Sequence, residues 1–345
     1  MKKRELNIEF IRVFAIFMVV MIHVSNIYIN SFSKISALHF NTAVVFNSIS
    51  RICVPLFFMV SGIFLINKEF DLKSYYKRIL KFVFLLTFWS VIYFLHNNNF
   101  KLNNFGKALA NSFFNADKTS RHLWFMYAII GIYIALPFIQ NMCKNMSREL
   151  ENLFLILWFS FSGLIVIFVP LIRYITKTDI DITYPIPIIN SAYYLGYFII
   201  GHILYERFKF ISPTAKKNLL CVGTYLISVF ISIIVTCFFT AKTNEIYEPM
   251  TWYRGIFIAL AACAVFILIV INKDKFKSNA ILTFSHRSFG IYLLHMLFLN
   301  HITENINVLE FNPLISIPLL TLVVYALSFI ASFILSKIPI IKNLV

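Results

Sequence analysis

Apolar stretches of about 20 residues, separated by short polar segments, follow one another along most of the chain. A helix needs about 20 largely apolar residues to cross the hydrocarbon core of a membrane. The segments that meet this length are 8–29, 46–66, 79–96, 123–142, 152–172, 189–206, 218–240, 252–272, 284–302 and 314–336. The pattern therefore predicts an all-α, polytopic integral membrane protein with about ten transmembrane helices.

The basic residues between these stretches predict an orientation. With the N-terminus in the cytoplasm, the connections on the cytoplasmic side hold 19 lysines and arginines, and those on the outer side hold 8. Basic residues gather in cytoplasmic connections, so we expect both termini in the cytoplasm. The net charge of +16 largely reflects this bias. It suits anionic membrane lipids and is no argument for nucleic-acid binding.

Composition supports the membrane class. Hydrophobic residues make up 59% of the chain and charged residues 13%, and the mean hydropathy is +0.78. Soluble domains contain about 25% charged residues. The basic start MKKRELN resembles that of a signal peptide, but no small-residue cleavage site follows, so we expect a retained first helix. The abundance of Asn, Lys, Ile and Phe indicates an AT-rich bacterial source, and hence a multi-pass protein of a bacterial plasma membrane.

Four arginines lie within the predicted spans or at their edges: Arg12, Arg51, Arg254 and Arg287. A charged side chain deep in a bilayer usually faces the bundle interior or a wet cavity. Arg254 and Arg287 can instead reach the membrane surface along their flexible chains. For Arg12 and Arg51 we favour a functional position. The 15 aspartates and glutamates all lie in connections or near span ends, which argues against a proton-coupled transporter.

The first span, RVFAIFMVVMIH, begins with Arg12 and ends with His23. Eleven residues make about three helical turns, so the two side chains lie on nearly the same face, roughly 16 Å apart along the axis. Glu9 precedes Arg12 by three residues and can pair with it. Two polar groups on one face of an apolar helix favour a functional site over a purely structural role.

The ninth span places Ser288, Tyr292 and His295 in one polar stripe. Such a stripe either bonds neighbouring helices or forms the wall of a cavity, and the sequence leaves both open. The fourth span starts with His122 and Trp124. The five cysteines lie in or beside apolar runs without a CxxC pair or His/Cys cluster, so we predict neither a disulfide framework nor a metal site.

Five motifs together resemble the acyltransferase 3 family of membrane acyltransferases. They are Arg12 to His23 preceded by NIEFIR, RICVPLFFMVSG (51–62), YYKRILKF (75–82), HLWFMYAIIGIYIALPFI (122–139) and SFGIYLLH (288–295), in the family's order. The third motif has Lys81 where members often have a second arginine, and no proline follows. The chain resembles the stand-alone members without a fused esterase-like domain, so we expect a single membrane acyltransferase domain over 1–345.

The resemblance implies transfer of an acyl group, usually acetyl, from acyl-CoA to a hydroxyl of an envelope polysaccharide or lipid-linked glycan. Acetyl-CoA would be a co-substrate, with no bound cofactor and no metal. His23 is our candidate for the general base or for a transient acyl carrier. Arg12, Arg78 and Lys77 are candidates for holding the phosphates of the donor. For Lys77 and Arg78, an ordinary role as basic residues of a cytoplasmic connection is equally compatible with the sequence.

On the acceptor side, Arg51 is expected near the outer end of the second span, where it would hold the acceptor or a developing oxyanion. His122, Trp124, Tyr292 and His295 are the other acceptor-side candidates. Trp124 would stack on a sugar ring or belong to the interfacial aromatic belt. The alternatives to an O-acetyltransferase are an exporter of a polysaccharide or its precursor, and a small-solute transporter. Dependence on acetyl-CoA separates the first from both others.

Overall fold

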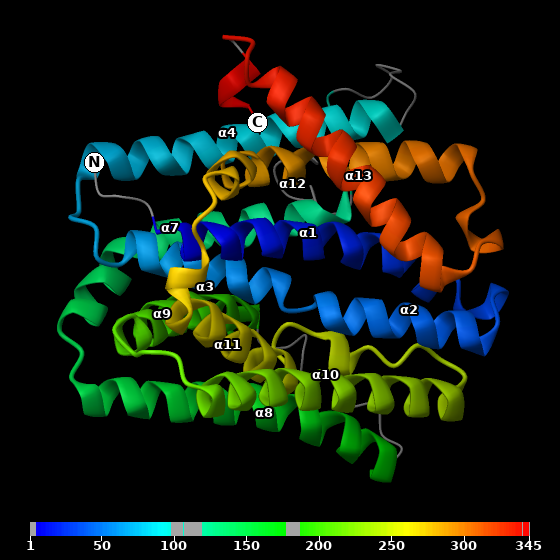
Figure 1. The fold of residues 1–345 in the computed structure, drawn as a ribbon, viewed down its shortest axis with the longest axis horizontal. Helices are drawn as coiled ribbons and strands as arrows, with labels where there is room; N and C mark the ends of the chain where they lie inside the picture. The colour runs from blue at the N-terminus through cyan, green and yellow to red at the C-terminus, as the bar shows by residue number, and fades with distance from the viewer. Residues whose placement is uncertain (1–4, 98–105, 107–118, 177–186, 340, 345) are drawn as a thin grey trace.

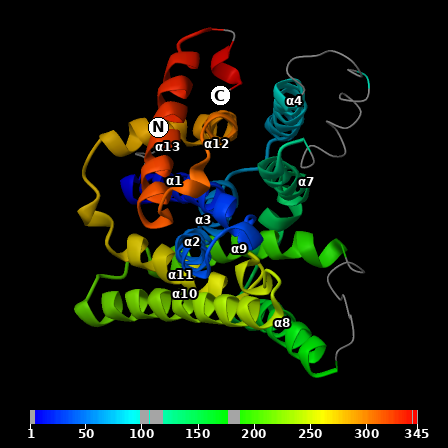
Figure 2. The ribbon, with the colours of Figure 1, turned by 90° about the vertical axis from the view of Figure 1, so that its right-hand side faces the viewer.

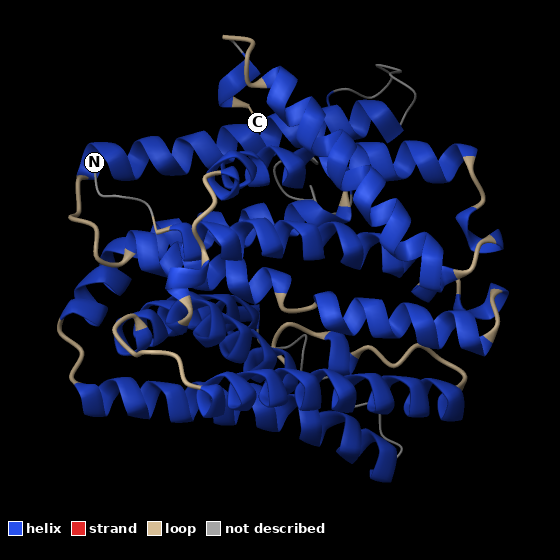
Figure 3. Ribbon diagram, viewed as in Figure 1, coloured by secondary structure: helices blue, strands red, loops and turns tan. Residues whose placement is uncertain are grey.

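The computed structural model describes residues 5–97, 106, 119–176, 187–339 and 341–344. In these ranges the backbone forms helices joined by loops, without strands (Figure 3). The predicted all-α class is therefore confirmed. The helices are α1 (Leu6–Ile29), α2 (Ala37–Ser50), α3 (Cys53–Leu65), α4 (Leu72–Asn97), α7 (Trp124–Lys144), α8 (Arg148–Thr176), α9 (Pro187–Phe208), α10 (Ala215–Thr243), α11 (Ile256–Ile271), α12 (Ala280–Asn305) and α13 (Pro313–Leu335).

Each predicted apolar segment coincides with helical structure. Within the described ranges, six stretches are long and apolar enough to cross a membrane, as expected of a membrane protein. They are Leu6–Ile29, Ala37–Leu65, Leu72–Asn97, Arg121–Lys144, Ala215–Thr243 and Pro313–Leu335. Most of the predicted polar connection over 97–122, and of that over 173–188, lies outside the described residues.

The second predicted segment, 46–66, was wrong in its start and in its continuity. Helix α2 begins at Ala37, and the helical path is interrupted between Ser50 and Cys53, where α3 starts. Pro55 explains the interruption. Proline has no N–H and its ring collides with the carbonyl four residues earlier, here that of Arg51, so it is tolerated only in the first turn of a new helix.

Helix α1 lies at the centre of the bundle, with α12 and α13 on one side and α2 and α3 on the other (Figures 1 and 2). The C-terminal end of α1 is hydrogen-bonded to α13 and to the loop that precedes α13. The Tyr28 hydroxyl lies 2.5 Å from the carbonyl of Val308, to which it donates, and 2.6 Å from the hydroxyl of Ser316. These bonds satisfy a buried polar atom and fix the rotation of α1 about its axis.

Helices α4 and α7 form a pair at one side of the bundle (Figure 2). Helix α7 also packs against α9 and α4 against α12, so the pair closes the space beside α1. The indole N–H of Trp89 on α4 donates to the carbonyl of Leu344 at 2.8 Å and holds the C-terminal turn against α4. Large apolar side chains are exposed on the outer helices, as lipid contact requires: Leu80, Phe84, Ile156, Phe161, Leu226, Phe230, Leu319 and Phe333.

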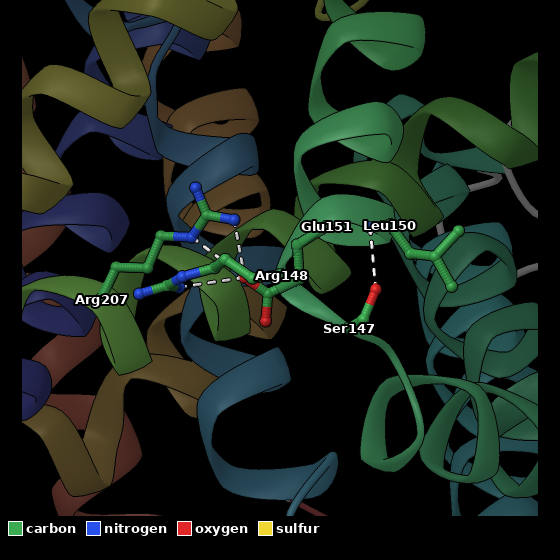
Figure 4. Close-up of polar contacts among 5 residues, drawn as sticks. All are labelled: Ser147, Arg148, Leu150, Glu151 and Arg207. Atoms are coloured by element: carbon green, nitrogen blue, oxygen red, sulfur yellow. Dashed lines mark hydrogen bonds and ion pairs between the residues drawn. The ribbon is translucent and has the colours of Figure 1, made fainter.

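An ion pair joins α8 to α9 (Figure 4). The Glu151 carboxylate accepts from Arg207 of α9 at 2.6 Å and from Arg148 of its own helix at 3.1 Å. The first turn of α8 is capped by Ser147, whose hydroxyl oxygen accepts the N–H of Leu150 at 3.3 Å. Together these contacts fix the start of α8 beside the end of α9.

Helices α3 and α9 approach each other through two glycines. A Cβ on Gly62 would lie 1.9 Å from the carbonyl oxygen of Phe198, and a Cβ on Gly201 would lie 2.3 Å from the Cα of Met59. Real atoms do not approach so closely, so a methyl group at either position would separate the helices. Small residues thus allow these two helices to pack closely.

We expect Gly201→Ala to lower the thermal unfolding temperature in detergent. Overpacking a contact of this kind costs about 1–3 kcal/mol of unfolding free energy. Gly131→Ala in α7 is the matched control, because nothing lies within 4 Å of the position that the added methyl group would take. The control should leave the unfolding temperature unchanged or slightly higher. Equal unfolding temperatures for Gly201→Ala and the native chain would contradict the close packing of α3 and α9.

Candidate active site

A cavity of about 470 Å³ runs beside α1. It is lined by Arg12, His23 and Asn30 of the α1 region, so it follows the helix for 18 residues, or roughly 27 Å. The other walls come from α2, α3, α4, α7, α10, α12 and the segment between α10 and α11. We name its two ends the Arg12 end and the Asn30 end. The cavity is long enough to expose Arg12 and His23 to one extended ligand.

The Arg12 end contains the pair expected from the sequence. Arg12 Nη1 lies 3.3 Å from the carboxylate of Glu9, and the guanidinium lies 4.6 Å from the centre of the Phe64 ring. The hydroxyl of Ser285 on α12 donates to the same carboxylate. Glu9 is only 1% exposed, so this carboxylate is buried although it lies near the start of α1. Ser285 thus links the cation at this end to a second helix.

Three histidines from distant parts of the chain meet halfway along the cavity. The ring centre of His23 lies 5.1 Å from that of His295 and 6.3 Å from that of His122. The rings of His122 and His295 are 5.1 Å apart. His23 and His122 line the cavity, whereas His295 is fully buried behind them. Among the described residues, no group of three His, Cys, Asp or Glu side chains is arranged to hold a metal ion.

The hydrogen bonds of His295 determine which of its ring nitrogens carries the proton in the neutral form. Its Nδ1 lies 2.7 Å from the carbonyl of Tyr292 and 3.2 Å from that of Ile291. Carbonyls only accept, so Nδ1 must donate and Nε2 is left as an acceptor. Nε2 is buried without a partner in the described part of the chain. An unused acceptor beside the His23 ring can receive a proton or an N–H from it.

The polar stripe of α12 serves both of the purposes that the sequence left open. Ser288 and Tyr292 line the cavity. The Tyr292 hydroxyl also donates to the backbone carbonyl of His122 at 2.8 Å and so ties α12 to the start of α7. The His122 Nδ1 lies 2.9 Å from the hydroxyl of Ser120, which fixes the orientation of its ring.

Contrary to expectation, Arg51 does not lie near the outer end of a span. It lies at the break between α2 and α3. Its hydrogen-bond partner Asn47 contacts the part of α1 around His23, which shows that Arg51 lies at about the level of His23. The Arg51 Nε donates to Asn47 Oδ1 at 2.7 Å. Asn47 Nδ2 lies 2.9 Å from both Ser25 Oγ and Asn26 Oδ1. The break created by Pro55 therefore places this arginine in the cavity wall.

The remaining candidates differ in their placement. Neither Arg78 nor Lys77 lines the cavity. Arg78 is half-buried and lies 5.6 Å from the ring centre of Tyr133, which does line it, whereas Lys77 is exposed. Trp124 lines the cavity and packs against Tyr194 at 5.1 Å and Tyr253 at 5.8 Å between ring centres. Its ring thus belongs to an aromatic wall of the cavity.

The residues of the site that sequence reasoning missed include Asn47, Tyr133, Tyr253, Ser285, Arg121 and Glu248. The sequence did point to Asn47, because it is a polar residue inside the largely apolar run AVVFNSIS. Tyr133 and Ser285 had no such signal, because single tyrosines and serines are common in membrane helices. Tyr253, Arg121 and Glu248 lie in segments between the long helices, which hydropathy does not place in a site. Arg254 and Arg287 pack over Trp252 at 3.9 Å and over Phe333 at 5.4 Å, and neither lines the cavity.

We expect Glu9→Gln to destabilise the protein by about 1–3 kcal/mol, because Arg12 and Ser285 would lose a buried charged partner. Ser285→Ala should cost less, since Arg12 keeps its ion pair. Glu310→Gln is the matched control, as that carboxylate is exposed and accepts only from Asn307 in the described part of the chain. Thermal unfolding in detergent measures all three. A Glu9→Gln protein as stable as the control would show that the buried pair is unimportant for folding.

The chain matches one known protein family over almost its whole length. The model of the acyltransferase 3 family, described as an acyltransferase domain, matches residues 5–337. No curated protein matches the chain, and no solved structure matches it. The match includes every residue that lines the cavity. The chain therefore belongs to the acyltransferase 3 family and is a membrane acyltransferase.

Proposed function

We propose that the protein is a membrane O-acetyltransferase. It would move an acetyl group from acetyl-CoA to a hydroxyl of an envelope polysaccharide or lipid-linked glycan in a bacterial plasma membrane. The observation that carries the proposal is the position of His23, which lies halfway along a cavity lined by Arg12 at one end and by aromatic and polar groups at the other. Donor and acceptor can therefore reach one histidine from opposite ends.

The Arg12 end suits the donor. The phosphates of acyl-CoA need cations. Arg12 lines the cavity at this end, and Arg78 lies over Tyr133, a residue of the wall within electrostatic range of both arginines. With ten spans and both termini in the cytoplasm, as the basic residues predict, this end faces the compartment where acyl-CoA is made. The thin pantetheine arm then bridges the roughly 16 Å between Arg12 and His23 and brings the thioester to the histidine.

The chemistry requires a base beside the thioester. His23 removes the proton of the acceptor hydroxyl, the oxygen attacks the thioester carbon, and the carbon–sulfur bond breaks. The proton then returns from His23 to the leaving thiolate, so the histidine is regenerated. In the covalent version, a ring nitrogen of His23 carries the acetyl group between the two substrates. Both versions use the same histidine and the same two ends of the cavity.

The histidines behind His23 support this role. Because the Nε2 of His295 is an acceptor, it suits an N–H of the His23 ring and would leave the opposite nitrogen of His23 with a lone pair for the acceptor hydroxyl. Tyr292 holds the segment that carries His122 against α12, which keeps the three rings together. We propose that His122 and His295 orient His23 rather than contact the acceptor sugar.

Export of a polysaccharide is the second candidate function, because the cavity follows α1 over most of its length. A passage for a glycan needs the same extent and the same polar groups. It needs no acyl-CoA, however, and a histidine at its centre has no role in such a passage. Dependence of the glycan product on acetyl-CoA separates the two functions.

We expect His23→Ala to lower acetyl transfer by about 10²–10⁴-fold, as loss of a general base does. The measurement counts label from acetyl-labelled acetyl-CoA in the glycan and lipid-linked fractions of membranes. His301→Ala is the control, because His301 is exposed at the end of α12 outside the cavity. Full transfer by the His23→Ala chain would reject the proposed role. No label with the native chain, given a suitable acceptor, would favour export.

We expect Arg78→Ala to raise the KM for acetyl-CoA by about tenfold, the effect of losing one charge-assisted contact of about 1.4 kcal/mol. Lys77→Ala carries the same change of charge on the neighbouring residue. It should change the KM little, since Lys77 is exposed, whereas Arg78 is half-buried against Tyr133 of the cavity wall. Initial rates at varied acetyl-CoA compare the two variants. Equal KM values for both would show that only the general charge of this face attracts the donor.

A further inference from the structure

We infer that the acceptor carries a negatively charged group, a carboxylate or a phosphate, and that Arg51 binds it. This inference rests on the proposed acetyl transfer and names the class of the acceptor. Its starting point is a half-buried arginine in the cavity wall at the level of His23. In the described part of the chain, Arg51 has no ion-pair partner. A charge held in a membrane interior without a counter-ion is costly, so an anionic ligand stabilises it.

The donor groups of Arg51 are positioned for such a ligand. A guanidinium has five N–H donors, and the one on Nε is used by Asn47. The other four are on the two Nη atoms, and the edge between these atoms carries two parallel N–H groups that match the two oxygens of a carboxylate or phosphate. The centre of the guanidinium is 5.6 Å from the Tyr253 ring, which packs on this group. The Nη edge therefore remains for the ligand.

Asn47 fixes the direction in which the guanidinium of Arg51 points. Its Oδ1 must face Arg51, because Nε–H only donates. Its Nδ2 then faces α1, where Ser25 Oγ and Asn26 Oδ1 accept from it. Asn47 is fully buried and all of these contacts agree with one orientation of the amide. Arg51 is thus held in place before a ligand arrives, which lowers the entropy lost on binding.

The charges around Arg51 have the sign that an anion needs. The cavity is lined by three arginines, Arg12, Arg51 and Arg121, and by one carboxylate, Glu248. Arg12 is paired with Glu9 at the other end. Arg51 and Arg121 lie within electrostatic range of the His23 ring. The Asn30 end therefore keeps an excess of positive charge beside the histidine.

The acyl donor does not supply this anion. Its phosphates bind at the Arg12 end in the proposed function, roughly 16 Å from His23. The pantetheine arm and the acetyl thioester that reach His23 are uncharged. A negative group beside Arg51 therefore has to come from the acceptor. The aromatic wall formed by Trp124 and Tyr253 adjoins the arginine and suits the faces of sugar rings.

The test compares three short acceptor glycans that differ at one sugar only: uncharged, with a uronic-acid carboxylate, or with a phosphate ester. The full chain in lipid nanodiscs receives acetyl-labelled acetyl-CoA, and kcat/KM is measured for each acceptor. We expect the native chain to prefer one of the charged glycans by about tenfold or more. The preferred glycan identifies the source of the charge. Arg51→Gln should abolish the preference and leave the KM for acetyl-CoA unchanged.

Further variants test whether the preference depends on the guanidinium of Arg51 and on its orientation. Arg51→Lys should keep part of the preference, and Asn47→Leu should weaken it, because the guanidinium loses its fixed direction. Arg287→Gln is the control, since this arginine lies outside the cavity wall and should leave the preference unchanged. A fall of equal size for all three glycans in Arg51→Gln would show that Arg51 stabilises the oxyanion of the reaction, and would overturn the inference.

Failure of this inference is distinguishable from failure of the proposed function. Equal kcat/KM on charged and uncharged glycans by the native chain overturns the anionic acceptor and leaves acetyl transfer in place. If the protein uses none of the three short glycans, the glycan that becomes labelled in membranes of the organism that makes the protein is tested for charge by anion-exchange chromatography. Elution of this labelled glycan together with neutral glycans would overturn the inference. No label in any glycan rejects acetyl transfer itself.

Discussion

A polar side chain inside a membrane finds no water, so it must bond to another part of the protein. This constraint determines how α1 is held. Glu9 accepts from Ser285 of α12, and Ser25 accepts from Asn47 of α2. Tyr28 reaches Ser316 of α13. Each bond joins α1 to a different helix, so the apolar core and the cavity along α1 depend on a small number of polar contacts.

The site is assembled from segments that are distant in sequence, and each is positioned by a local feature. Proline at position 55 interrupts the second hydrophobic stretch and places Arg51 at the level of His23. Tyr292 bonds the backbone at His122 and so brings the start of α7 to α12. The glycines of α3 and α9 let these helices approach closely behind the cavity. Reactive groups and structural groups are therefore interleaved on the same helices.

Helix class, the positions of most helices and the Glu9–Arg12 pair could be predicted from the sequence, because length, hydropathy and helical spacing are local properties. The break at Arg51 could have been predicted, since Pro55 follows four residues later. The apolar residues around the proline, however, make the stretch look like one continuous span. The meeting of His23, His122 and His295 could not be predicted. It depends on how helices pack, and periodicity along one helix says nothing about which neighbour its polar face meets.

The arginines of the cavity also have a consequence for permeability. A cavity that admits substrates from both ends of a membrane protein could let small ions cross with them. Fixed positive charge along such a path raises the electrostatic energy of a cation inside it, as it does in channels that exclude protons and metal ions. Arg12 lines one end of the cavity, and Arg51 and Arg121 lie near His23, so a cation would meet this barrier at both places. The same charges that are proposed to bind anionic substrates would thus also oppose the loss of the cell's ion gradients.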